Sequence, residues 1–93
     1  IQIIDMYIPS SVLVTGGAGF IGSNFLNIMV KKHPTYKWIC LDKLDYCSSV
    51  NNISEVVNEL VFEKGDILDS NHVSKVLERY QVDTVIHFAA QSH

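Results

Sequence analysis

The sequence has few cysteines, no long apolar run and no excess of basic residues. Its two cysteines, Cys40 and Cys47, lack the C-x-x-C spacing of a zinc or redox site. We expect both to be small apolar side chains in a reducing compartment, which indicates the cytoplasm. No apolar stretch approaches the ~18 residues that cross a membrane. Residues 1–8 also lack the basic start of a signal peptide, so we expect no membrane partner.

The charge and composition of the sequence exclude further classes of protein. The formal net charge is −3, and the seven lysines and arginines are scattered, whereas nucleic-acid-binding proteins normally carry a basic patch. We therefore expect no nucleic-acid partner. A content of 47% hydrophobic and 18% charged residues excludes a disordered chain. Because the chain starts at Ile1 and stops at His93 after an apolar segment, we expect a fragment. Residues 1–10 would be an N-terminal extension, and residues 11–93 part of a domain that continues beyond residue 93.

Short apolar runs alternate with segments of helical periodicity. Four runs predict β-strands at residues 12–15, 38–41, 60–62 and 84–88. The first helix begins at Phe20 and ends before Pro34, with an apolar stripe of Ile21, Phe25, Ile28 and Met29. The second helix is capped by Asp69 or Ser70, with a stripe of Val73, Val76, Leu77 and Tyr80. We expect a further short helix at residues 53–58.

This alternation predicts the fold class. Strands that read as continuous apolar runs between helices indicate a parallel sheet that is covered on both faces, and its crossovers are right-handed. The prediction is α/β: the N-terminal half of a doubly wound parallel-sheet (Rossmann) domain with strand order 3-2-1-4. The fourth strand would lie at an edge of the sheet.

A glycine cluster, TGGAGFIG at residues 15–22, carries the chemistry. Gly16 permits a sharp turn out of the strand, Gly19 permits close approach of a pyrophosphate, and Gly22 permits the helix to pack close to the sheet. The free N–H groups at the start of the helix then bind a diphosphate. Glycines also serve plain turns, but this cluster lies between a strand and a helix, as a dinucleotide site requires. The lysine of a Walker loop is absent.

Acidic residues follow two of the strands. Asp42 lies 20 residues after Gly22, where a carboxylate binds the adenosine ribose and repels the 2′-phosphate of NADP. The cofactor is therefore predicted to be NAD. Asp66 lies where the adenine edge is expected; for both aspartates a plain turn role stays open. Small residues after the fourth strand, Ala89 and Ala90, permit a flat ligand to approach. The four histidines lack the spacing of metal ligands, so we expect no metal site.

Together these residues resemble the extended short-chain dehydrogenase/reductase family, and within it the nucleotide-sugar 4,6-dehydratases of the dTDP- or UDP-glucose type. Three stretches carry the resemblance: TGGAGFIG, LDKLDYC at residues 41–47 and HFAAQSH at residues 87–93. The resemblance implies cofactor contacts along the whole chain. These would come from Phe20, Ile21, Asp42, Lys43, Leu44, Asp45, Asp66, Ile67, Phe88, Ala89, Ala90 and Ser92, of which Ser92 would also lie near the substrate.

The resemblance also implies a reaction. A hydride leaves C4 of the sugar for NAD, water is eliminated across C5 and C6, and the hydride returns to C6. The substrate would be a nucleotide sugar, dTDP- or UDP-linked, and the parent protein a homodimer. The family's catalytic Tyr-x-x-x-Lys pair and Asp-Glu pair fall beyond residue 93, so we name no catalytic residue and expect the chain alone to be inactive.

Other functions stay open. A related epimerase, decarboxylase or reductase uses the same scaffold, because cofactor motifs do not determine the reaction. A non-catalytic NAD-binding protein is the alternative from another class. A methyltransferase also combines a glycine loop with an acidic residue, but the helix start found here suits a diphosphate better.

Overall fold

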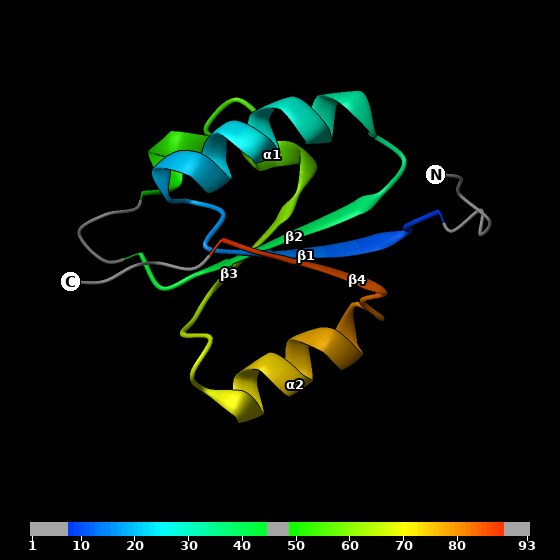
Figure 1. Cartoon of the computed structure of the whole chain (residues 1–93), viewed down its shortest axis with the longest axis vertical. Coiled ribbons are helices and arrows are strands. Elements are labelled where there is room, and N and C mark those ends of the chain that lie inside the picture. Colours follow the sequence, from blue (N-terminus) through cyan, green and yellow to red (C-terminus); the bar gives the residue numbers. More distant parts are fainter. Residues whose placement is uncertain (1–7, 45–48, 89–93) are drawn as a thin grey trace, which may run out of the picture.

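The computed structural model describes residues 8–44 and 49–88. Within them, four parallel strands form one sheet in the order β3-β2-β1-β4, which confirms the predicted fold class. The strands are β1 (Ser11–Thr15), β2 (Lys37–Asp42), β3 (Val61–Lys64) and β4 (Thr84–His87). Figure 1 shows helix α1 (Phe20–Lys32) on one face of the sheet and helix α2 (Ser70–Arg79) on the other.

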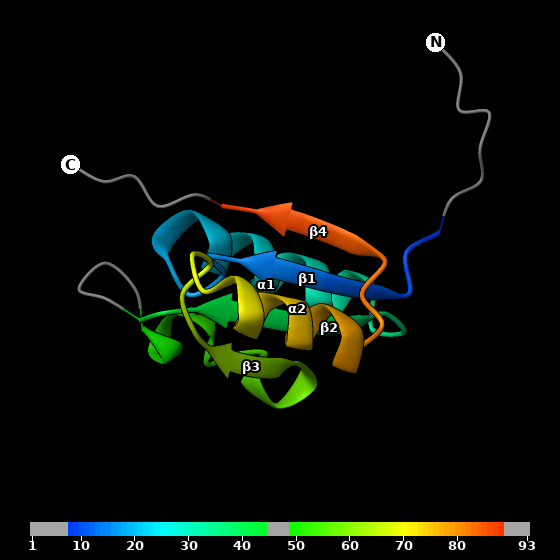
Figure 2. The same cartoon turned by 90° about the horizontal axis from the view of Figure 1, so that it is seen from below.

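Each face of the sheet buries its own apolar cluster. The cluster on the α1 side comprises Val12, Val14, Leu26, Val30, Trp38, Cys40, Ile53 and Val56. The cluster on the α2 side comprises Leu13, Ile39, Leu41 and Val76. Strand β1 is buried along its whole length because β2 and β4 flank it, and Figure 2 shows it between them. Cys40 is a free thiol with a pKa that burial raises to about 12, so it serves as a small apolar side chain.

The apolar stripe predicted for the first helix is wrong at two of its four positions. Ile21 and Ile28 are 67% and 63% exposed, whereas Phe25 and Met29 are partly buried against the α1-side cluster. The buried positions are Gly22, Ser23, Leu26 and Val30. The physical reason is that the helix approaches the rest of the molecule through small residues at its start, which a count of apolar residues overlooks.

The remaining elements differ from prediction mainly between β2 and β3. In place of a helix at residues 53–58 the chain forms two 3-10 turns, η1 (Val50–Ile53) and η2 (Val57–Glu59). Helix α2 is capped by Asp69, which accepts a 3.2 Å hydrogen bond from the N–H of His72, and it buries Val76 as predicted. Neither described helix is long and apolar enough to span a membrane.

Candidate functional site

The loop between β1 and α1 lies where the carboxyl ends of the parallel strands meet. It begins at Gly16, whose N–H donates a 2.8 Å hydrogen bond to the carbonyl of Leu41. Gly16 has a φ of +73°, a backbone conformation that residues other than glycine rarely adopt. A Cβ at this position would also overlap the carbonyl oxygen of Phe88. Gly16 is therefore required both by its backbone conformation and by the approach of the chain that follows β4.

Two further glycines hold the loop against its surroundings. A Cβ on Gly22 would overlap the Gly16 carbonyl oxygen and lie 2.9 Å from the Cα of Gly17. Helix α1 thus starts against the backbone of the loop itself, rather than against the strands as the sequence suggested. The sequence pattern predicted no role for Gly17. A Cβ on this residue would lie 2.7 Å from both Cys40 Sγ and Leu26 Cδ1. The feature that marks Gly17 in the sequence is that it directly follows another glycine, Gly16.

Gly19 differs from the other loop glycines because a Cβ there would overlap no other atom. A Cβ there would meet only the Gly16 carbonyl oxygen, at 3.4 Å. The first helical hydrogen bond runs from the Ser23 N–H to the Gly19 carbonyl, at 2.9 Å. Among the described residues, the N–H groups of Phe20, Ile21 and Gly22 donate no hydrogen bond. Such a helix start, with no acidic residue in its first turn, can bind an anionic group.

The carboxylate of Asp42 is joined to this loop. Asp42 ends β2 and is only 7% exposed. Its Oδ2 accepts a 3.0 Å hydrogen bond from the N–H of Ala18, and its Oδ1 accepts a 2.8 Å hydrogen bond from the N–H of Leu44. Leu44 has a φ of +60°, so the chain turns sharply directly after the strand. The structure thus brings Asp42 to the glycine loop, as the predicted dinucleotide site requires.

The turn after β3 lies beside the turn after β2. The N–H of Gly65 donates a 3.0 Å hydrogen bond to the carbonyl of Asp42, and Lys43 Nζ lies 3.9 Å from Asp66 Oδ2. The other carboxylate oxygen of Asp66 accepts a 2.9 Å hydrogen bond from the N–H of Leu68. Ile67, which lies between Asp66 and Leu68 in the sequence, is 45% exposed. The residues predicted for the ribose and the adenine are therefore neighbours in space.

At the end of β4 the described chain stops with Phe88. Its N–H donates a 2.9 Å hydrogen bond to the Thr15 carbonyl, and its ring packs on Phe25 with centroids 5.3 Å apart. The Phe88 ring therefore belongs to the α1-side core, while its carbonyl faces Gly16. The other predicted contacts, Asp45, Ala89, Ala90 and Ser92, lie outside the described residues.

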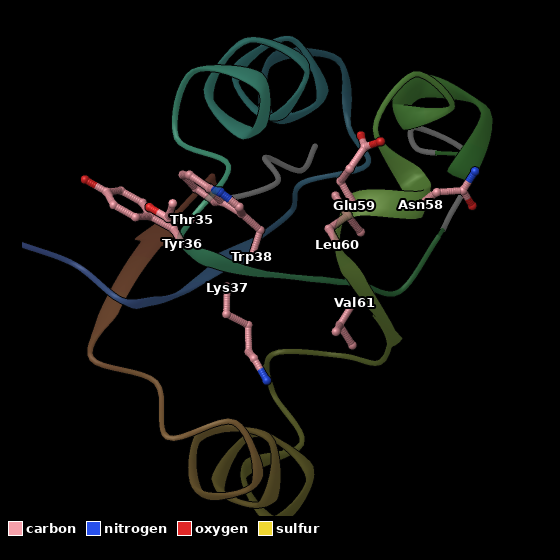
Figure 3. Close-up of a pocket in the computed structure, with 8 residues that line it drawn as sticks. All are labelled: Thr35, Tyr36, Lys37, Trp38, Asn58, Glu59, Leu60 and Val61. Carbon is pink, nitrogen blue, oxygen red and sulfur yellow. The ribbon is translucent and has the colours of Figure 1, made fainter.

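A surface depression of about 450 Å³ lies at the opposite end of the sheet. Figure 3 shows that it is formed where β2 begins and where the chain enters β3, by Thr35, Tyr36, Lys37, Trp38, Asn58, Glu59, Leu60 and Val61. None of these residues takes part in the glycine loop or the aspartate turns. The depression is therefore separate from the candidate site.

Comparison with known proteins identifies the family. The family model described as GDP-mannose 4,6 dehydratase matches residues 13–93. The chain belongs to this family. Its resemblance to the nucleotide-sugar dehydratases of the extended short-chain dehydrogenase/reductase family is thereby confirmed. A dTDP-D-glucose 4,6-dehydratase of Dictyostelium discoideum is 48% identical over 91 residues, which are 96% of this chain and 21% of that protein.

Two further relatives bear on the site. A trifunctional UDP-glucose 4,6-dehydratase, 3,5-epimerase and reductase of Arabidopsis thaliana is 45% identical over 89 residues, 94% of this chain and 13% of that protein. The crystal structure of a dTDP-glucose 4,6-dehydratase from Bacillus anthracis, in complex with NAD, superposes with a TM-score of 0.84 at 38% identity. That match covers 88% of this chain and 27% of the solved one. The chain thus spans about a quarter or less of the length of these relatives.

Proposed function

We propose that the chain is the NAD-binding segment of a nucleotide-sugar 4,6-dehydratase, a lyase that forms the 4-keto-6-deoxy nucleotide sugar. One observation carries the proposal: the 3.0 Å hydrogen bond between the Ala18 N–H and Asp42 Oδ2. It joins the two halves of a dinucleotide site, the anion-binding helix start and the ribose-binding carboxylate. The family and the NAD-bound relative of known structure support the same assignment.

The residues present fit NAD. The free N–H groups of Phe20, Ile21 and Gly22 would bind the diphosphate, because Gly19 offers no side chain to fill that space. Asp42 and Lys43 would hold the ribose, with Leu44 and Asp45 in the same contact segment. Asp66 and Ile67 would frame the adenine. Phe88, through its main chain, together with Ala89, Ala90 and Ser92 would line the rest of the cofactor. When bound, NAD supplies a hydride acceptor that is regenerated at the end of the cycle.

The substrate belongs to the same proposal. The relatives named above act on dTDP-glucose and on UDP-glucose, so either nucleotide sugar is a candidate, with Ser92 near it. The catalytic acid, base and Tyr-Lys pair would lie in sequence outside this chain, which alone would be inactive. We also propose that the whole protein works in the cytoplasm as a homodimer. The buried free thiol of Cys40 suits a reducing compartment.

The experiment uses the full-length protein that contains this chain. It is incubated with dTDP-glucose and with UDP-glucose, and the product is identified by mass spectrometry and NMR. We expect a 4-keto-6-deoxy sugar from one of them, retention of NAD during purification, and a dimer by light scattering. Formation of a C4 epimer without loss of water would identify an epimerase instead. Failure to bind NAD would overturn the whole proposal.

A further inference from the structure

The peptide groups on both sides of Ala18 are held by atoms from other parts of the chain. Ala18 is fully buried. Its N–H donates to Asp42 Oδ2, and its carbonyl oxygen accepts two hydrogen bonds, from the N–H of Ser49 at 3.1 Å and from Asn52 Nδ2 at 2.8 Å. The next N–H, that of Gly19, donates to the Gly16 carbonyl at 3.2 Å. The loop is therefore fixed immediately before α1 begins.

Asn52 is the one side chain among the described residues that bonds this carbonyl, and it is itself anchored. It lies in the 3-10 turn η1, which follows β2 in the chain. Its own carbonyl accepts a 3.1 Å hydrogen bond from Asn27 Nδ2, on α1. Asn52 thus links the turn after β2 to α1 through its main chain and to the glycine loop through its side chain. An amide is suited to this place because it offers a donor without adding charge.

We propose that Asn52 is a positioning residue for the diphosphate of the dinucleotide, an inference that rests on the proposed function. The carbonyl of Ala18 belongs to the same peptide group as the N–H of Gly19, one residue before the free N–H groups of α1. By holding that carbonyl, Asn52 keeps the start of α1 in place before any ligand arrives. Such preorganisation raises affinity because less order has to be created on binding.

The test distinguishes an effect on diphosphate binding from an effect on adenosine binding. Asn52→Asp is nearly isosteric but replaces the donor with an oxygen that repels the Ala18 carbonyl. Asn51→Asp is the matched control, because it adds the same charge in the same turn on an exposed residue. Full-length protein stripped of cofactor is titrated calorimetrically with NAD, ADP and adenosine. We expect N52D to raise the Kd for NAD and ADP about tenfold, as loss of one hydrogen bond does, and to change adenosine binding less than about twofold.

The expected result for N51D is unchanged affinity for all three compounds. Equal NAD affinity in N52D and the unchanged protein would overturn the inference while leaving the proposed function intact. Equal losses for NAD and adenosine, or failure of both N52D and the uncharged Asn52→Leu to fold, would make Asn52 merely structural and overturn it also. If the unchanged protein does not bind NAD, the proposed function fails, and this inference fails with it.

Discussion

Gly22 packs so closely on Gly16 that a Cβ on Gly22 would overlap the Gly16 carbonyl oxygen, whereas a Cβ on Gly19, in the same loop, would lie 3.4 Å from that oxygen, an ordinary contact. The two glycines therefore serve different purposes. We predict that Gly22→Ala lowers the free energy of unfolding by about 1–3 kcal/mol, the usual cost of overpacking. Gly19→Ala should change it by less than about 1 kcal/mol, yet weaken NAD binding more than tenfold.

Denaturant unfolding and NAD titration of both variants in the full-length protein measure this difference. The two variants introduce the same methyl group three residues apart, so each is the control for the other. NAD affinity retained in Gly19→Ala, with the fold intact by circular dichroism, would mean that the loop is only a turn.

The second prediction concerns the choice of cofactor. A carboxylate at position 42 would face the 2′-phosphate of NADP, so the unchanged protein should bind NAD more tightly than NADP. Asp42→Ser should reduce that preference at least about tenfold, since the repelling charge is removed. It should also weaken NAD binding itself, because the Ala18 N–H loses its acceptor. Titration with both cofactors checks this, and NADP binding as tight as NAD in the unchanged protein would contradict the ribose role of Asp42.

The third prediction is a pH dependence. The Tyr80 hydroxyl donates a 2.7 Å hydrogen bond to Glu63 Oε2, which joins the C-terminal cap of α2 to β3. This bond lowers the pKa of Glu63 and raises the pKa of Tyr80. A carboxyl group whose pKa is lowered by folding contributes stability above its unfolded value of about 4.3, and loses it as pH falls through its folded pKa. A tyrosine whose pKa is raised contributes stability below about pH 10 and loses it as pH rises through its folded pKa.

Tyr80→Phe should therefore lower the free energy of unfolding by about 1 kcal/mol between about pH 5 and pH 9, and by less at about pH 3. His72 and Arg79 also face Glu63, at 3.5 and 3.4 Å, and they remain in the variant. Tyr36→Phe is the matched control, because the Tyr36 hydroxyl makes no hydrogen bond to the described residues. A difference between the two variants that is constant from pH 3 to 9 would contradict the role of Glu63.

The architecture could be predicted from the sequence because local patterns restrict the possible strand orders. Four apolar runs and two periodic segments leave few topologies once the glycine loop selects a doubly wound sheet. The buried face of α1 was harder to predict, because Ile21 and Ile28 fit an apolar stripe as well as Leu26 and Val30 do. The close contact of Gly22 with the loop, rather than hydrophobicity, determines which face is buried. The bonds of Asn52 to Ala18 and Asn27 span 34 and 25 residues, and no local pattern encodes them.

The last prediction concerns the 93-residue chain produced by itself. Among the described residues β4 pairs only with β1, so one edge of the sheet offers unpaired backbone groups to another chain. Val85, in the middle of that strand, is 54% exposed. We expect weak, concentration-dependent folding, loss to aggregation, and no keto-sugar product. Val85→Lys should raise the soluble monomeric fraction several-fold, because a lysine on an edge strand opposes pairing with a second chain.

Ile28→Lys is the matched control, since it replaces a 63% exposed isoleucine on α1 and adds the same charge away from the edge. If general solubility were the cause, the two variants would behave alike. Size-exclusion chromatography with light scattering, at two protein concentrations, measures the monomeric fraction, and thermal unfolding with and without millimolar NAD measures folding. A cooperative, soluble monomer of the unchanged chain that NAD stabilises would contradict the prediction, because the β4 edge would then need no further protein to cover it.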